Sequence, residues 1–265
     1  MPIKNTLSAF ILCFGTERKM KMQDKIIGRN PVMEAIRSGR EIEKIFIKKG
    51  GAEGSIVSII KKARDSGIIV TEVDKQKLDS LSEGGNHQGI VAIAAVCEYA
   101  TVGDILKRAE EKGKPPFIII CDKITDPHSL GSIIRTANCV GADGIIVPKR
   151  NSVGLNAVVD KTSAGALEYT PVAKVTNIAR TLDELKEKGL WIAGADMGEQ
   201  AMYDADLTGA IGLVIGSEGE GISTLVREKC DFLVSIPMSG EINSLNASVA
   251  AAVLMYEIAR QRGKK

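Results

Sequence analysis

The stretch "FIIICDKITDPHSLGSIIRTA" (residues 117–137) joins a continuous apolar run to a polar turn and then to a helical pattern. Five apolar residues in a row, with no alternation, are typical of a strand that is covered on both faces, as in a parallel sheet. Similar runs recur at 144–148, 190–195, 211–216 and 232–237, with helical spacing between them. Because parallel strands need such crossovers, this part of the chain is predicted to be an α/β domain built on a parallel sheet.

The polar residues that follow the first run predict a turn and a helix. In parallel sheets, ligands bind beyond the carboxyl ends of the strands, so site residues are expected here. Asp126 and Pro127 favour a turn, and Gly131 is expected to let the chain enter the helix tightly. Arg135 is expected about one turn into that helix. Near helix N-terminal amides its guanidinium could clamp a phosphate, although pairing with a neighbouring carboxylate is equally compatible with these residues.

A second strand end, "LVIGSEGEGIS" (213–223), places Glu218 and Glu220 among glycines. Glycine lets the backbone turn sharply and approach a bound molecule closely, so this loop is a candidate site. The glycine order G-x-x-G-x-G is not the dinucleotide fingerprint and does not follow the first strand of a βαβ unit, so a nicotinamide site is not supported. A tight turn with solvated acids is the alternative.

The third candidate loop begins "IPMSGEINSLN" (236–246) and leads into the last helical pattern of the chain. Ser244 or Asn246 is expected to cap that helix. Its buried stripe is expected at Val249, Val253 and Tyr256, which recur at helical spacing.

The part of the chain before residue 100 predicts a second, smaller α/β unit. Strand patterns at 44–49, 67–73 and 89–96 alternate with helical patterns at 55–65 and 75–82. A polar segment that ends in Lys-Pro-Pro then connects the two units. The expected division is an unstructured leader at 1–21, a first domain at 22–98, a linker at 99–115 and a second domain at 116–265.

Composition narrows the possible classes of protein. The chain has 265 residues, of which 44% are hydrophobic and 26% charged, as in ordinary globular proteins. Its five cysteines are widely spaced without a CxxC pair, so neither a disulfide framework nor a metal site is indicated. No segment reaches the roughly 18 apolar residues of a membrane span. A cytoplasmic protein is expected, and the net charge of +2 does not by itself identify a partner.

Taken together, the three loops resemble the three motifs of the SpoU/TrmH family of RNA ribose 2′-O-methyltransferases, in the SPOUT class. The similarity covers residues 26–262. It includes "IIGRNPVMEAI" (26–36) and "NHQGIVA" (86–92), which resemble the substrate-binding domain of the ribosomal RNA branch of the family.

The resemblance implies a fold, a cofactor and a set of site residues. It implies a first domain like RNA-binding ribosomal proteins, a deep trefoil knot at the carboxyl end of the second domain, S-adenosylmethionine bound at that knot, and a homodimer. The implied catalytic residues are Arg135, Glu218, Asn246 and Ser244. The implied cofactor-binding residues are Gly216, Ile236, Met238 and Leu245.

These residues are expected to have different roles at the reacting ribose. Gly216 is expected to let the chain pass against the adenosine part of the cofactor, and Glu218 to orient the 2′-hydroxyl or take its proton. Arg135 is expected to hold a phosphate of the target nucleotide rather than act as a base, because the pKa of arginine is above about 12. Glu220 is expected to be a surface residue.

The substrate that the resemblance favours is a guanosine in 23S ribosomal RNA. Transfer RNA, an adenosine whose methylation blocks an antibiotic, and a non-catalytic RNA-binding role in ribosome assembly are the alternatives. Ser129 gives weight to the last, because the family usually has asparagine at this position. No DNA, membrane or metal partner is expected.

Overall fold

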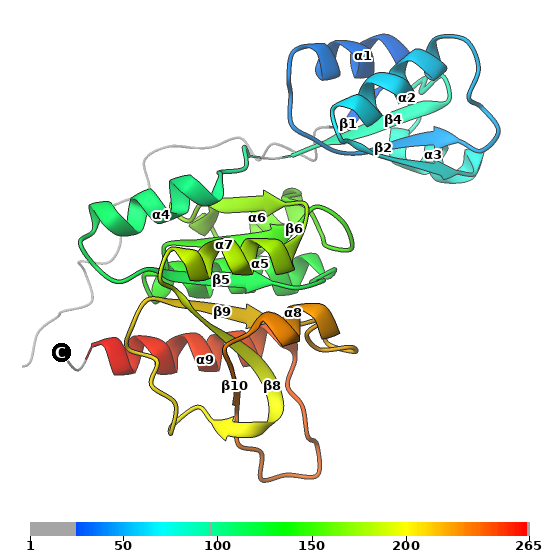
Figure 1. Cartoon of the computed structure of the whole chain (residues 1–265). Coiled ribbons are helices and arrows are strands. Elements are labelled where there is room, and N and C mark those ends of the chain that lie inside the picture. Colours follow the sequence, from blue (N-terminus) through cyan, green and yellow to red (C-terminus); the bar gives the residue numbers. More distant parts are fainter. Residues whose placement is uncertain (1–24, 96, 264–265) are drawn as a thin grey trace, which may run out of the picture.

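Two α/β units follow one another along the chain (Figure 1). They contact each other through an ion pair between Glu43 and Lys174. The computed structural model describes residues 25–95 and 97–263, so the predicted leader at 1–21 lies outside the described residues. One sheet has four strands in the order β1-β4-β2-β3, and the other has six in the order β10-β8-β9-β5-β6-β7. The boundaries that the sequence suggested for the domains stay a prediction.

The first unit packs helices on both faces of a small mixed sheet. Its elements are β1 (Lys25–Ile27), α1 (Arg29–Arg37), β2 (Ile42–Lys48), α2 (Ser55–Asp65), β3 (Ile69–Val73), α3 (Lys75–Ser82) and β4 (Ile90–Ala94). The pair β2 and β3 is parallel, whereas β4 runs antiparallel to both β1 and β2. All five residues of β4 are buried, because α1 and α2 cover one face of the sheet and α3 covers the other.

The second unit is a parallel sheet, as the apolar runs predicted. Its first elements are α4 (Val102–Glu111), β5 (Phe117–Cys121), α5 (Pro127–Cys139), β6 (Gly144–Pro148), α6 (Ala157–Ser163), a 3-10 turn (Ala166–Glu168) and β7 (Val172–Val175). Its remaining elements are α7 (Ile178–Glu187), β8 (Trp191–Ala201), β9 (Ile211–Ile215), α8 (Thr224–Lys229), β10 (Phe232–Ser235) and α9 (Ala247–Arg262). Every neighbouring pair in the sheet is parallel. The knot at its carboxyl end stays a prediction.

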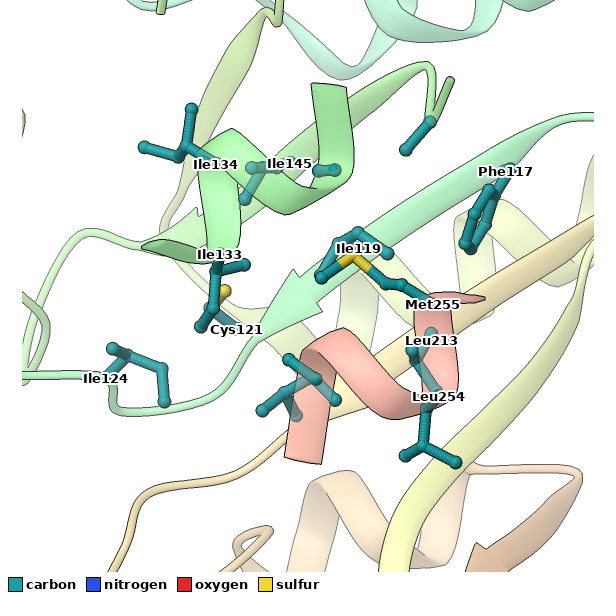
Figure 2. Packing of buried hydrophobic residues seen from close by; sticks show 14 of the residues in the cluster. Phe117, Ile119, Cys121, Ile124, Ile133, Ile134, Ile145, Leu213, Leu254 and Met255 are labelled. Carbon is teal, nitrogen blue, oxygen red and sulfur yellow. The ribbon is translucent and has the colours of Figure 1, made fainter. Parts of the chain in front are cut away.

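The central strand β5 explains why its sequence shows no alternation. Phe117, Ile119 and Cys121 face the layer of α5, α6 and α9, where Figure 2 shows Ile119 beside Met255. The residues between them face α4, α7 and α8. Each β5 side chain is at most 2% exposed, so both faces of the strand contribute to the core. Full burial of such side chains stabilises a fold by about 1.5–3 kcal/mol each.

The helix α4 lies within the segment expected to be a linker. It begins with a capping box in which Thr101 and Asp104 bond to each other's backbone amides. Its buried face packs on β6, where a Cβ on Gly144 would overlap the side chain of Ile105. This segment is therefore packed against the second sheet.

The last helix, α9, corrects one sequence expectation. Val249 and Tyr256, expected in its buried stripe, are 47% and 57% exposed. Val253, the third expected residue, is partly buried against the core. The buried positions lie mainly on another face and are Ala247, Ala251, Leu254, Met255, Glu257 and Ile258. Periodicity alone could not choose between the two faces, because α9 is apolar on both.

Between the two units, the carboxylate of Glu43 on β2 joins three groups that the sequence analysis did not single out. It lies 2.5 Å from the ammonium of Lys174 on β7, and both side chains are nearly buried. The backbone amide of Leu155 donates a hydrogen bond of 3.0 Å to it, and the Tyr99 hydroxyl donates another. Burial, together with the Glu43 charge, raises the pKa of Tyr99 far above its ordinary value, so this hydroxyl keeps its proton. The two units are thus joined by a fully paired buried carboxylate.

Candidate active site

The loop after β9 (residues 216–223) closes tightly on itself. Ser217 and Gly221 exchange two backbone hydrogen bonds of 3.0 Å each, and Gly221 has a φ of +66°. A Cβ on Gly216 would overlap the backbone of Gly221 and Ile222. Glycine is therefore required at position 216 because the backbone there lies very close to its own loop. From the sequence, this close approach was attributed to the cofactor.

Two contacts tie this loop to the loop that follows β5. Asp122 is buried, and its Oδ2 accepts a hydrogen bond of 2.7 Å from the amide of Ser223. Lys123 and Glu220 form an ion pair of 2.9 Å, which raises the pKa of Lys123. Glu220 is exposed as expected, yet it is also paired. The two loops thus form one structure at the carboxyl ends of adjacent strands.

The carboxylate of Glu218 is held by two neutral donors. Asn246 caps α9, because its Oδ1 accepts from the amides of Ser248 and Val249 at 3.0 and 3.4 Å. This confirms Asn246 as the capping residue and turns its Nδ2 toward Glu218, to which it donates. Ser129 donates a second hydrogen bond of 3.3 Å to the same carboxylate oxygen. Both donors are neutral, and both bond to the same carboxylate oxygen, Oε1.

A cavity of about 660 Å³, called here the larger cavity, lies on one side of this loop. Its lining contains all four residues that the sequence analysis assigned to the cofactor: Gly216, Ile236, Met238 and Leu245. Ser244 and Glu218 also line it. Buried Val234 and Leu254 give it apolar walls, while Asp196 and Asn243 add polar groups. Its size and mixed lining are those of a small-molecule site.

A second cavity of about 470 Å³, the smaller cavity, adjoins the same loop. Lys123, Asp126, Ser129 and Asn151 line it. Residues 217–220 line both cavities, so this loop is their common wall. Glu218 is therefore placed to act on a molecule in either cavity.

Arg135 is the predicted site residue that the structure sets apart. Asp126 caps α5 and Pro127 is its first residue, so Arg135 lies eight residues further along, more than two turns rather than one. Its side chain is exposed and lines neither cavity. Gly131 lies inside α5, where a Cβ would overlap Thr162 of α6. Its role is close packing of two helices, because the proline already starts the helix.

The features of the cavities that were missed from the sequence include Lys123, Asn151 and the role of Ser129 as a partner of Glu218. Lys123 follows β5 and Asn151 follows β6, so the rule that pointed to Glu218 also pointed to them. Lys123 and Asn151 have φ values of +60° and +55°, which non-glycine residues adopt rarely. No motif in the sequence marks that conformation.

Among the described residues, none of the helices is long and apolar enough to cross a membrane. No group of three His, Cys, Asp or Glu side chains in the described residues could hold a metal ion.

Comparison with known proteins gives consistent results along most of the chain. Residues 116–256 match the model of the SpoU rRNA methylase family. Residues 25–100 match the model described as RNA 2′-O ribose methyltransferase substrate binding.

Individual relatives match over nearly the whole chain. A Bacillus subtilis protein named as the TrmH family tRNA/rRNA methyltransferase YacO is 48% identical, covering 91% of this chain and 97% of its own. A Staphylococcus aureus protein named as a TrmH family tRNA/rRNA methyltransferase is 49% identical, with 91% and 98% coverage. The fold is shared with the SpoU methyltransferase AviRb from Streptomyces viridochromogenes, solved with AdoMet, at a TM-score of 0.59, 24% identity and 91% coverage of both chains.

Proposed function

Because the chain belongs to the SpoU/TrmH family of RNA methyltransferases, we propose that it transfers a methyl group from S-adenosylmethionine to a ribose 2′-hydroxyl of RNA. The observation that carries this proposal is the position of Glu218 in the common wall of two cavities. One cavity would hold the methyl donor and the other the nucleotide.

The larger cavity fits S-adenosylmethionine by size and by lining. Its volume of about 660 Å³ and its apolar walls suit an adenosine, and its polar groups suit the amino acid part of the molecule. We assign Gly216, Ile236, Met238 and Leu245 to this site, with Ser244 beside them. When bound, the cofactor would supply an electrophilic methyl group on a sulfonium. A protein of the same fold has been crystallised with this cofactor.

Glu218 would act on the hydroxyl that attacks the methyl group. Its carboxylate would orient the 2′-hydroxyl toward the donor methyl group and accept the proton that the hydroxyl loses. Asn246 keeps Glu218 in position, because its own amide oxygen is held by the start of α9. Holding the reactants in line could contribute up to about 7–11 kcal/mol to catalysis.

Arg135 would act where two copies of the chain meet. Val249 and Tyr256 form an exposed apolar stripe on α9, which packs against α5, the helix that carries Arg135. This stripe supports a homodimer, in which Arg135 would hold a phosphate of the RNA across the interface. Sedimentation of the protein at several concentrations tests this, and a monomer at all concentrations would contradict it.

The substrate that we favour is a guanosine in 23S ribosomal RNA. The match of residues 25–100 to a substrate-binding model supports residues 22–98 as the RNA-binding domain, ahead of a knotted methyltransferase domain at 116–265. The relatives are named for both tRNA and rRNA, so transfer RNA is the second candidate. Both RNAs would be met in the cytoplasm.

Two measurements test the proposal. Calorimetric titration with S-adenosylmethionine should show binding, whereas a non-catalytic assembly factor predicts no heat. Mapping of ribose methylation in total RNA after deletion of the gene should reveal one missing mark. A mark missing from transfer RNA would move the substrate to that class, and an unchanged map together with no heat would refute the activity.

A further inference from the structure

The crevice between the two units contains two adjoining hollows that differ in charge. One, of about 320 Å³, is lined by acidic Glu41 and Glu43 as well as by basic residues. The other, of about 600 Å³, is called here the basic hollow. Its lining is Lys44, Arg64, Gly67, Ile68, Ile69, Val70, Arg150 and Asn151, which includes three cations and no acid.

The three cations of the basic hollow come from both units. Lys44 lies on β2, Arg64 lies at the end of α2, and Arg150 follows β6 of the second unit. Arg64 and Arg150 are exposed, and the Lys44 ammonium lies 5.4 Å from the centre of the Phe46 ring. Within the described part of the chain, none of the three forms an ion pair with an acid. Like charges that converge without compensation raise the affinity of a site for an anion.

Asn151 connects the basic hollow to the proposed reaction site. It lines both the basic hollow and the smaller cavity. The smaller cavity is also lined by Glu218. A linear polymer bound in the basic hollow can therefore continue past Asn151 into the smaller cavity, where Glu218 would meet a ribose.

We propose that the basic hollow holds the phosphates of the RNA strand next to the methylated nucleotide, an inference that rests on the proposed function. Lys44, Arg64 and Arg150 contact the phosphates, and Asn151 contacts the sugar or base at the entrance to the smaller cavity. An RNA strand fits because it presents connected negative charges together with the ribose that Glu218 needs. An acidic peptide supplies the charge without the ribose.

The buried pair of Glu43 and Lys174 makes this hollow a formed site. Lys44 is next to Glu43 on β2, and Lys174 on β7 pairs in register with Val147 on β6, three residues before Arg150. The pair therefore holds the two walls of the hollow in one arrangement. Phosphate contacts of this kind set the position of the strand and carry no sequence preference.

The test uses single and combined replacements Lys44→Gln, Arg64→Gln and Arg150→Gln in the full chain. Lys75→Gln on α3 and Lys107→Gln on α4 are matched controls, because both lysines are exposed and line neither hollow. Binding of a 23S ribosomal RNA transcript is measured over a range of salt concentrations. Cofactor binding and methyl transfer are measured on the same proteins.

Each replacement in the hollow should weaken RNA binding and raise the KM for RNA by roughly fivefold, and the dependence of log Kd on log salt should lose about one unit per cation. Cofactor affinity and kcat at saturating RNA should stay unchanged. RNA binding equal to that of the two controls would overturn the inference. So would equal competition by polyglutamate and polyuridylate, which would indicate an acidic peptide.

Failure of the proposed function would look different. If RNA binding depends on the three cations but the wild-type protein transfers no methyl group, the activity is refuted and the RNA-binding hollow stands. If the wild type methylates RNA and the three replacements have no effect, the hollow is refuted and the activity stands.

Discussion

Glu43 lies near the start of β2 and Glu218 lies in the loop after β9, and the surroundings of these two glutamates are opposite. Glu43 is almost buried and meets a cation, a phenol and a backbone amide. Glu218 is exposed and meets an amide and a hydroxyl, both neutral. A buried carboxylate needs a full set of partners, because removal from water is costly. An exposed one held by neutral groups can take a new partner at little cost.

Glu43 therefore stabilises the packing of the two units, whereas Glu218 is placed to take part in a reaction. Changing Glu43 should alter stability and the relation between the two units. Changing Glu218 should alter the reaction and leave the fold intact. The predictions below test that separation, from the largest expected effect to the smallest.

The first prediction concerns the replacement Glu43→Ala. It leaves Lys174 buried without its partner, so the free energy of unfolding should fall by about 3–5 kcal/mol. Chemical denaturation measures this, with Glu41→Ala as the control because Glu41 is exposed and two residues away. A loss below about 1 kcal/mol, as expected for a surface pair, would place Glu43 in the same class as Glu218.

The replacement Glu218→Gln should act on rate. The amide keeps the shape of the side chain but cannot take a proton, so methyl transfer at saturating RNA and cofactor should fall about a hundredfold, or ~2.7 kcal/mol. The denaturation midpoint should not move. Glu220→Gln in the same loop is the control and should remain active. Near-normal turnover of Glu218→Gln would remove Glu218 from the reaction.

Gly216→Ala should affect the common wall of the two cavities. The added methyl group overlaps the backbone of Gly221 and Ile222, so the loop must shift, at a cost of about 1–3 kcal/mol. Calorimetry should show weaker binding of S-adenosylmethionine together with the lower stability. Gly219→Ala is a sharp control, because no atom lies within 4 Å of its Cβ position. If the two variants behave alike, the loop is less tightly closed than its backbone bonds indicate.

The smallest effect is expected for Ser129→Ala. It removes one of the two donors to Glu218, a loss of ~1 kcal/mol or roughly fivefold in rate. Ser129→Asn, which restores the residue usual in the family, should be at least as active as the wild type. An inactive Ser129→Asn would show that this chain has adapted its site to the shorter side chain.

Regular patterns in the sequence predicted the parallel sheet because burial on both faces leaves an unbroken apolar run. They missed β7, whose four residues include Lys174, and they chose the wrong face of α9. Three-residue β1 is too short for any periodicity to show.

Two signals in the sequence predicted part of the site: the polar residues at strand ends and the resemblance to the family motifs. Gly216, Ile236, Met238 and Leu245 all line one cavity, although their proposed roles there remain to be tested. Arg135 was misplaced by more than one turn, because Pro127 rather than Gly131 begins the helix. The bond from Ser129 to Glu218 joins residues 89 positions apart, and only the folded sheet brings these two together.

The loop at residues 217–220 lines both cavities, and a different molecule is expected in each of them. Any occupant that restrains Glu218 from one cavity changes the free energy of restraining it from the other, and by thermodynamic linkage that influence is equal in both directions. Affinities for the two occupants therefore cannot evolve independently. A single compound that contacts both cavities would gain binding free energy from each of them, which makes residues 217–220 a target for inhibitor design.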